Sequence, residues 1–499
     1  MPVMSNDALA RASGRRLIAG VAWNALGRGL PLILALLLTP ILVGQLGIER
    51  WGIFTLALAL VGVFGMLDLG IGPALTRALA ERIGNHEREG EGAMVASAIA
   101  MLGVVSVAGS IGAFLAVPAL VTRVLNVPPA LQDEAIAAMR VLVGSAPLVV
   151  VNAALWGVLA AHQKFRAANL VSMPVGIFYY LGPVLVLSVW NTLSGAMLAL
   201  VACRLVNTLS YAVLVRPLLP SFGPVRLAAV VPLLRIGGWM TFSSALSQAL
   251  NYADRFLVGA MLTMAAVAFY ATPLDLVMRF WIFPVAVAQA LLPALASSFR
   301  SLPAETAALL RRGVLLVGAI VLPAALLLAI FAEPLLRLWL GQAFAAGSAA
   351  VARILAVGIL FNCLAFAPGS LIEAIGRPEL LARFSLVQAV LFLPLSALLL
   401  LLVGIEGAAI AWALRAATDC AGRLLLAAHV YPAAAAALRP LALPIAIGGT
   451  GLLAAALLPM LPAVAIAGAT ALAFGLLAWR ALPVADRAHL LALTQRRPA

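Results

Sequence analysis

The chain has 499 residues, of which 64% are hydrophobic and only 10% are charged, and its mean hydropathy is +1.12. This composition excludes a soluble globular domain and identifies lipid as the solvent of the chain. The net charge of +14 comes largely from short loops between apolar blocks, which indicates membrane topology and argues against nucleic-acid binding. The sequence therefore predicts an integral membrane protein.

The apolar blocks predict helices and not a β-barrel. They run for roughly 20 residues or more, enough for a helix to cross about 30 Å of hydrocarbon, and they lack the alternating polar positions of barrel strands. We expect an all-α fold of about fourteen spans, at 17–43, 51–76, 93–121, 135–160, 169–189, 193–215, 236–262, 265–297, 313–332, 349–374, 382–403, 405–428, 440–460 and 462–480.

The basic residues predict the orientation of these spans, because short loops rich in Lys and Arg stay in the cytoplasm. With the N-terminus inside, 21 of the 32 basic residues lie in cytoplasmic segments and eight lie within spans. The predicted outer segments hold only Arg50, Arg123 and Arg337. We expect both termini to be cytoplasmic and the membrane to be a bacterial inner membrane.

An internal repeat relates the two halves of the chain. At an offset of 216 residues, Trp23 matches Trp239, Phe54 matches Tyr270 and Pro118 matches Pro334. The same offset aligns the first and seventh spans and the second and eighth. Because six spans separate the copies, the two halves have the same orientation, an arrangement found in transporters that bind substrate between two bundles.

The repeat and the loops together predict the domain organisation. It comprises a cytoplasmic tail at 1–16, a first six-helix lobe at 17–215, a cytoplasmic linker at 216–235, a second six-helix lobe at 236–428, an accessory helix pair at 439–480 and a cytoplasmic tail at 481–499.

Charged residues inside the predicted spans indicate where function resides. A charge at the bilayer centre costs about 2.5–3.5 kcal/mol on insertion scales, so one that persists there normally faces a cavity or a partner. The spans hold eight arginines and five acidic residues, an excess of positive charge: Arg28, Arg140, Arg204, Arg255, Arg279, Arg353, Arg415 and Arg423 against Asp68, Asp254, Asp275, Glu373 and Asp419.

Some of these charges have the spacing of ion pairs along one helix, because residues four apart share a face. Asp275 with Arg279 fits this spacing, and so does the series Arg415, Asp419 and Arg423. These residues are candidates either for coupling or for structural ion pairs.

Arg28, Arg140 and Arg204 differ from these, because each lies on a separate first-half span with no acid within one helical turn. The planar fork of Arg suits bidentate contact with phosphate. They are candidate anion-binding residues, together with Arg255 and Arg279 of the second half. Asp68 and Asp254 are candidates for coupling to a proton or a sodium ion, and no other cofactor is expected.

The sequence shows no catalytic constellation or metal cluster. The longest predicted outer loop, 122–134, is too short for a catalytic domain, and Cys203, Cys363 and Cys420 lack metal-ligand spacing. We therefore expect a transporter and not an enzyme.

Several segments resemble polysaccharide flippases of the Wzx type, in the MOP superfamily that also contains the MATE exporters and the lipid II flippase MurJ. The matching segments appear in the expected order over most of residues 15–430, as LGIERWG (46–52), LDLGIGPALTRALAE (67–81), GVLAAHQKFRAANLVSM (157–173), LLRIGGW (233–239), NYADRFLVGAML (251–262), PLLRLWLG (334–341) and LIEAIGRPEL (371–380).

This resemblance implies two facing lobes of six helices around a central cavity, with the last two spans as an accessory pair. It implies as substrate an oligosaccharide linked through pyrophosphate to a polyprenyl lipid, moved to the periplasmic leaflet for surface polysaccharide such as O-antigen, capsule or exopolysaccharide. The implied partners are membrane lipids and the polymerase and glycosyltransferases of the same pathway. Candidate glycan contacts are Asn24, Trp156, Tyr179, Tyr180, Asn207, Tyr252, Trp281 and Asn362.

Three other functions compete with this hypothesis. A cation-coupled antiporter of small molecules would favour acids in its cavity, whereas the spans carry an excess of arginine. A lipid II flippase would be required for viability and not for a surface glycan. A membrane-embedded glycan ligase or polymerase would need an extended outer region, which the predicted loops lack.

Overall fold

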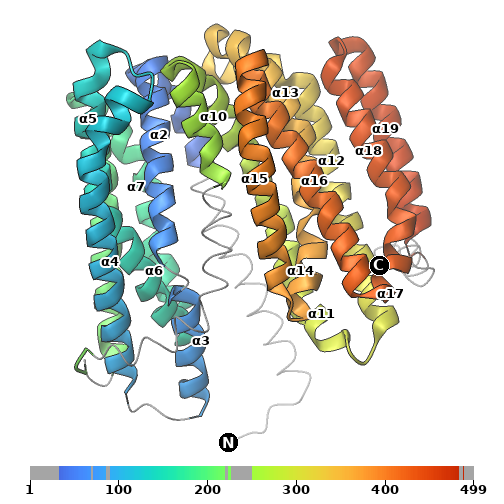
Figure 1. Cartoon of the computed structure of the whole chain (residues 1–499), viewed down its shortest axis with the longest axis horizontal. Helices are drawn as coiled ribbons and strands as arrows, with labels where there is room; N and C mark the ends of the chain where they lie inside the picture. The colour runs from blue at the N-terminus through green and yellow to red at the C-terminus, as the bar shows by residue number, and fades with distance from the viewer. Residues whose placement is uncertain are drawn as a thin grey trace, which may run out of the picture. The chain divides into compact units, whose positions relative to one another are not determined.

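A computed structural model gives the fold of residues 33–68, 71–85, 90–219, 223–225, 250–482 and 487. Within these ranges the side chains of Met66, Asp68 and Pro73 are not described. The described residues form helices joined by short turns and contain no strand (Figure 1). Ten of their helices are long and apolar enough to cross a membrane. The prediction of an all-α membrane protein is confirmed, while the count of about fourteen spans stays a prediction.

The chain divides into two compact units, Met1–Gln248 and Ala249–Ala499. The predicted linker at 216–235 falls partly outside the described residues, and the cytoplasmic tail predicted at 1–16 lies wholly outside them. The helices described in the first unit are Ile33–Leu46, α2 (Ile48–Phe64), α3 (Ile71–Gly84), α4 (Glu91–Ala119), α5 (Pro129–Gly144), α6 (Ala146–Ala161), α7 (Phe165–Val189) and α8 (Leu193–Val215).

The second unit repeats this order of elements and then adds to it. Its described helices are residues 250–261, α10 (Met264–Met278), α11 (Ile282–Ser298), α12 (Pro303–Leu340), α13 (Gln342–Leu364), α14 (Phe366–Ala374), α15 (Pro378–Val403), α16 (Ile405–Val430), α17 (Pro432–Leu438), α18 (Ala442–Leu457) and α19 (Met460–Ala481). From α2 to α8 and from α10 to α16, each element of one unit has a counterpart in the other near the offset of 216 residues.

Local sequence explains several helix starts. Pro129, Pro303, Pro378 and Pro432 each begin a helix, at the position where the missing N–H of proline has no cost. The Thr192 hydroxyl accepts a hydrogen bond from the Gly195 amide at 3.1 Å and so caps α8. Thr263 caps α10 in the same way through the Ala266 amide.

Several predicted spans differ from the observed helices, among them the spans at 51–76 and 313–332. The span predicted at 51–76 is interrupted, because α2 ends at Phe64, a 3₁₀ turn covers Gly65–Asp68 and α3 starts at Ile71. The glycines and proline around this point weaken a continuous helix. The span predicted at 313–332 lies within α12, which begins at Pro303 and continues to Leu340 across a kink at Phe331, where the backbone leaves helical geometry. The predicted end of the span thus falls near this kink, while the charged residues that bounded its start belong to the helix.

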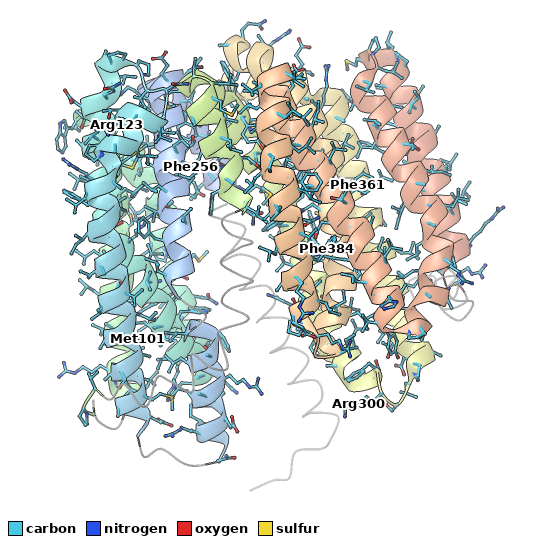
Figure 2. All side chains as sticks on the ribbon, viewed as in Figure 1. Met101, Arg123, Phe256, Arg300, Phe361 and Phe384 are labelled. Carbon is cyan, nitrogen blue, oxygen red and sulfur yellow. The ribbon has the colours of Figure 1, made fainter. Side chains whose placement is uncertain are left out.

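Close packing in the second unit depends on small residues, as is common between membrane helices. A Cβ added at Gly422 of α16 would lie 2.1 Å from the ring of Phe384 on α15, and one at Gly449 of α18 would lie 2.5 Å from the Phe361 ring of α13. Figure 2 labels both phenylalanines. The C-terminal helices α18 and α19 pack on α12, where Gly318 meets Phe474.

Candidate functional site

In the first unit, Arg204 of α8 lies half-buried with neutral partners. Its guanidinium donates hydrogen bonds to the Ser145 hydroxyl at 2.7 Å and to the Tyr179 hydroxyl at 3.2 Å. Ser145 lies at the break between α5 and α6, and Tyr179 lies on α7. No carboxylate of the described residues pairs with Arg204. Within the described part of the chain, its charge therefore has no acidic partner, and only two of its N–H donors are used.

Arg140 has different surroundings, although it lies on the same unit. Its guanidinium lies 4.7 Å from the ring centre of Phe114 on α4 and donates to the Phe114 carbonyl at 3.4 Å. Phe114 is 42% exposed. Arg140 therefore contacts Phe114 and none of the partners of Arg204, which are Ser145 and Tyr179. Arg28 lies outside the described residues, and so does the side chain of Asp68.

A third arginine of this unit is held by an acid. Arg50 of α2 forms an ion pair with Glu134 of α5 at 2.5 Å, and it donates to the side chain and the carbonyl of Asn191. Glu134 also accepts the Leu193 amide at 2.8 Å. This network connects α2, α5 and the turn before α8, so it stabilises the unit and leaves Arg50 engaged.

In the second unit, Asp254 and Arg255 are both buried, each with 7% of its surface exposed. The Tyr270 hydroxyl of α10 donates to Asp254 at 3.3 Å, and the Arg255 guanidinium binds the Asp275 carboxylate of α10. Adjacent positions on a helix point about 100° apart, which explains their separate partners. The structure thus gives Asp275 a partner on a neighbouring helix, Arg255, while the pairing of Asp275 with Arg279 that spacing predicts stays a prediction.

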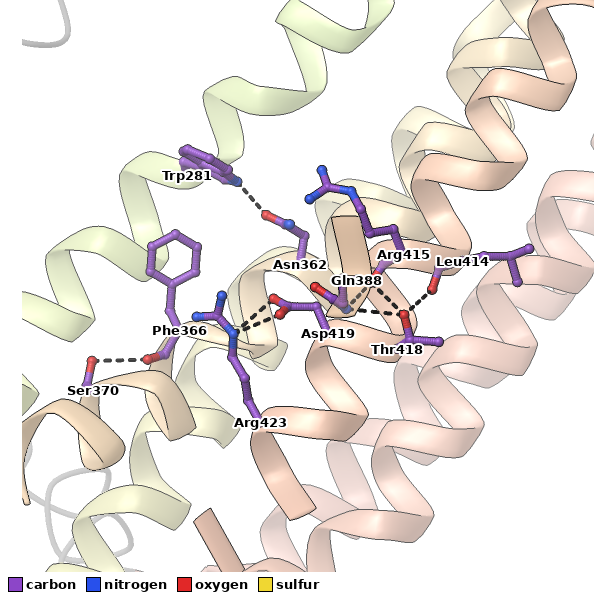
Figure 3. A network of polar contacts seen from close by, with 10 residues as sticks. All are labelled: Trp281, Asn362, Phe366, Ser370, Gln388, Leu414, Arg415, Thr418, Asp419 and Arg423. Atoms are coloured by element: carbon purple, nitrogen blue, oxygen red, sulfur yellow. Dashed lines mark hydrogen bonds and ion pairs between the residues drawn. The ribbon is translucent and has the colours of Figure 1, made fainter. Parts of the chain in front are cut away.

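A second group of charged residues lies along α16 (Figure 3). The Nε of Arg423 lies 3.0 Å from the Asp419 carboxylate, the pair that their spacing predicts. Gln388 of α15 donates to the Arg415 carbonyl and to the Thr418 hydroxyl, each at 3.4 Å. The Arg415 carbonyl, Thr418, Asp419 and Arg423 thus form one series of polar groups along α16 that Gln388 of α15 joins.

The structure also brings together two of the residues expected to contact a glycan. The indole N–H of Trp281 donates to the Asn362 side chain at 2.6 Å (Figure 3). Tyr179 and Tyr180 pack edge to face in the first unit, and Tyr252 lies beside the Arg255 guanidinium. Asn24 lies outside the described residues.

Three partners in these clusters were not predicted from the sequence: Ser145, Tyr270 and Gln388. A signal existed for Tyr270, since the repeat aligns it with Phe54, and both positions are buried. A hydroxyl added at an otherwise matched buried position requires a polar partner, which here is Asp254. Ser145 and Gln388 carry no comparable signal in a single sequence.

Comparison with known proteins decides the family. The model of the family described as "Polysaccharide biosynthesis protein" matches residues 17–299. The chain belongs to this polysaccharide biosynthesis family. A putative O-antigen transporter of Shigella flexneri is 26% identical over 417 residues, which cover 81% of this chain and 96% of that protein.

Solved structures share the fold of this polysaccharide biosynthesis protein at low identity. An inward-facing MATE-family multidrug resistance transporter of the MOP superfamily aligns with a TM-score of 0.72 and 17% identity, over 82% of this chain and 98% of that one. The lipid II flippase MurJ, in an inward closed conformation, aligns with a TM-score of 0.71 and 12% identity, over 92% and 99%. The predicted resemblance to the MOP superfamily is confirmed.

Proposed function

We propose that this protein moves an oligosaccharide, linked through pyrophosphate to a polyprenyl lipid, from the cytoplasmic to the periplasmic leaflet of a bacterial inner membrane. The family membership and the relative named as an O-antigen transporter support transport for surface polysaccharide. The protein acts as a transporter and not as an enzyme. Both termini are cytoplasmic, and the polymerase and glycosyltransferases of the same pathway are its partners.

The observation that carries the substrate class is the environment of Arg204. Its partners are the hydroxyl groups of Ser145 and Tyr179, which use two of its five N–H donors. A pyrophosphate presents several anionic oxygens that the remaining donors could bind, and charge-assisted bonds to phosphate are strong. An apolar or cationic substrate would leave this charge uncompensated at a cost.

The driving force in this proposal is a proton or sodium gradient, coupled through the second unit. Asp254 is buried there and accepts a hydrogen bond from the Tyr270 hydroxyl. The lobes change between inward and outward access while the lipid tail remains in the bilayer.

A cation-coupled antiporter is the second candidate function, and the buried Asp254 together with the MATE-like fold favours it. Deletion of the gene separates these functions. We expect a polyprenyl-pyrophosphate-linked oligosaccharide to accumulate in the cytoplasmic leaflet and a surface glycan to be lost. Accumulated lipid II with loss of viability would indicate lipid II flipping. Efflux of cationic dyes by purified protein in liposomes, without any accumulated glycan lipid in cells, would indicate the antiporter.

A further inference from the structure

An open cavity of about 590 Å³ lies between α3 and α6 in the first unit, and Arg204 is not among the residues that line it. Its α3 wall includes Thr76 and Arg77, and its α6 wall includes Asn152, Trp156 and Gly157. This volume falls in the range of about 300–1,000 Å³ typical of small-molecule sites. Arg77 is one of the basic residues that predict the cytoplasmic side, so the cavity lies near that face of the membrane.

The two walls are held at a fixed distance by a close helix contact. A Cβ added at Gly157 would lie 2.8 Å from the Gly72 carbonyl oxygen and 2.8 Å from the Thr76 hydroxyl oxygen. The Thr76 hydroxyl lies 2.9 Å from the Gly72 carbonyl and 3.2 Å from the Gly157 carbonyl. Glycine at 157 therefore lets α3 approach α6, and the Thr76 hydroxyl fixes the helix that carries Arg77.

Trp156 provides an aromatic surface in this cavity. Its ring packs against Phe165 and Tyr211, with ring centres 6.4 Å and 6.0 Å away, and yet 36% of the residue stays exposed. Its aromatic neighbours restrict the orientation of the ring. A braced, partly exposed indole is a surface on which the C–H face of a pyranose ring can stack.

Polar groups with unused hydrogen-bonding capacity lie beside this ring. Asn152 lies one helical turn before Trp156, and its Oδ1 accepts the Asn207 amide at 3.2 Å. This contact leaves the Asn152 amide N–H groups without a partner among the described residues. Arg77 is exposed and forms no ion pair with a described residue. An acyl chain of a lipid in this cavity would leave the Asn152 amide and the Arg77 guanidinium without hydrogen-bond partners, which costs binding free energy.

We propose that this cavity binds a glycosyl phosphate, with the pyranose on Trp156, a sugar hydroxyl on Asn152 and the phosphate on Arg77. The inference rests on the proposed function, because it assigns the cavity to the sugar–phosphate junction of the lipid-linked substrate on the cytoplasmic side. A nucleotide sugar contains the same chemical group and is the other possible source. Arg204 does not line this cavity, which would select for a sugar as well as for charge.

Binding to the full-length protein in lipid nanodiscs tests this assignment. The probes are the lipid-linked oligosaccharide extracted from cells that lack the gene, undecaprenyl pyrophosphate without sugar, and UDP-glucose. Trp156→Ala should weaken binding of the oligosaccharide lipid on the order of tenfold and leave that of undecaprenyl pyrophosphate within about twofold. Arg77→Ala should weaken both. Tighter binding of UDP-glucose than of the oligosaccharide lipid would assign the site to a nucleotide sugar and overturn the lipid-linked source.

Two further variants guard against a folding defect. Asn152→Asp keeps the size of the side chain but places a negative charge near the phosphate, so it should weaken both lipids. Trp156→Phe keeps an aromatic ring and should retain most of the binding. Trp190→Ala and Arg216→Ala, exposed residues outside the cavity, are matched controls and should bind as wild type does.

The outcomes separate this site from the proposed function. If the wild-type protein binds the oligosaccharide lipid and the Trp156, Asn152 and Arg77 variants bind it equally well, the cavity is not the site and the proposed function stands. If the wild-type protein binds none of the extracted lipid, both the proposed function and this assignment are wrong.

Discussion

At the scale of single residues, Arg204 carries the main argument for an anionic substrate. Replacing it with Ala removes the charge and the donors, and hydrogen bonds to charged groups contribute about 1.5–3 kcal/mol each. We expect Arg204→Ala to lower the rate of glycan-lipid transport by about 10- to 100-fold. Export of surface glycan, measured with the protein level in the membrane, checks this prediction.

Two variants make this test specific. Arg204→Lys keeps the positive charge but loses the planar fork, so an intermediate loss indicates that charge matters more than bidentate geometry. Arg216→Ala removes an exposed arginine of the same unit and should leave export unchanged. Normal export by Arg204→Ala would remove the reason for placing pyrophosphate contacts in the first unit.

The acids of the second unit should divide into a coupling residue and a structural one. Asp275 neutralises Arg255, whose side chain is only 8% exposed, so Asp275→Asn should lower the thermal stability of the purified protein. Asp254 accepts a neutral hydroxyl, and Asp254→Asn should keep stability while it removes the dependence of transport on pH or on sodium. Transport that keeps its ion dependence in Asp254→Asn would make this acid structural.

Positions of the charged residues could be predicted from the sequence, but most of their partners could not. The Asp419–Arg423 pair is local, so spacing along one helix predicts it. Arg255 binds Asp275, and Arg204 binds Ser145 from 59 residues away. Such contacts depend on how helices rotate and pack, which hydropathy does not specify. Arg140, grouped with Arg204 by sequence, proves to contact Phe114.

At the scale of the helices, hydropathy predicted the long apolar helices better than the points where they break. The spans predicted at 135–160 and 349–374 are interrupted at Ser145 and at Ala365. Both breaks come shortly before a proline, Pro147 and Pro368, which cannot donate to the preceding turn. No charged residue lies within four residues of either break. Hydropathy therefore predicts one continuous span at each of these places. The break at Ser145 matters, because it places the Ser145 hydroxyl beside Arg204.

Close contact between α13 and α16 provides a prediction at this scale. A Cβ at Gly358 would lie 2.5 Å from the Trp412 ring and 2.9 Å from the Ala413 Cα. Because backbone must move, Gly358→Ala should destabilise the protein by about 1–3 kcal/mol, measured as thermal unfolding in detergent. Gly103→Ala on α4, where nothing lies within 4 Å, is the matched control and should be neutral or slightly stabilising. Equal stability of the two variants would contradict this packing.

At the scale of the whole molecule, the two units repeat one order of helices but differ in how the arginines inside the predicted spans are paired. Among the described residues of these spans, Arg204 and Arg140 of the first unit have no acidic partner, whereas Arg255, Arg423 and Arg353 of the second unit pair with acids. The repeat itself could be predicted from the offset of 216 residues. The difference in pairing could not, since it depends on contacts between helices.

The orientation of the molecule is a separate prediction. A fluorescent reporter fused after Ala499 should fold and fluoresce, because such reporters mature in the cytoplasm, and an alkaline phosphatase inserted in the 122–134 loop should be active outside. The same phosphatase inserted at 162–164 is the control and should be inactive. Activity at 162–164 would reverse the orientation derived from the basic residues.

Transport by purified protein in liposomes tests the central claim most directly. Vesicles are loaded with the oligosaccharide lipid from cells that lack the gene, and a membrane-impermeant oxidant added outside measures how much glycan is exposed. With the wild-type protein, the glycan of the inner leaflet should become accessible; with Arg204→Ala it should become accessible about 10- to 100-fold more slowly, and without protein it should stay protected. If the inner-leaflet glycan stays protected from the oxidant in vesicles that hold the wild-type protein and a proton or sodium gradient, the protein does not move this lipid, and the proposed function is wrong.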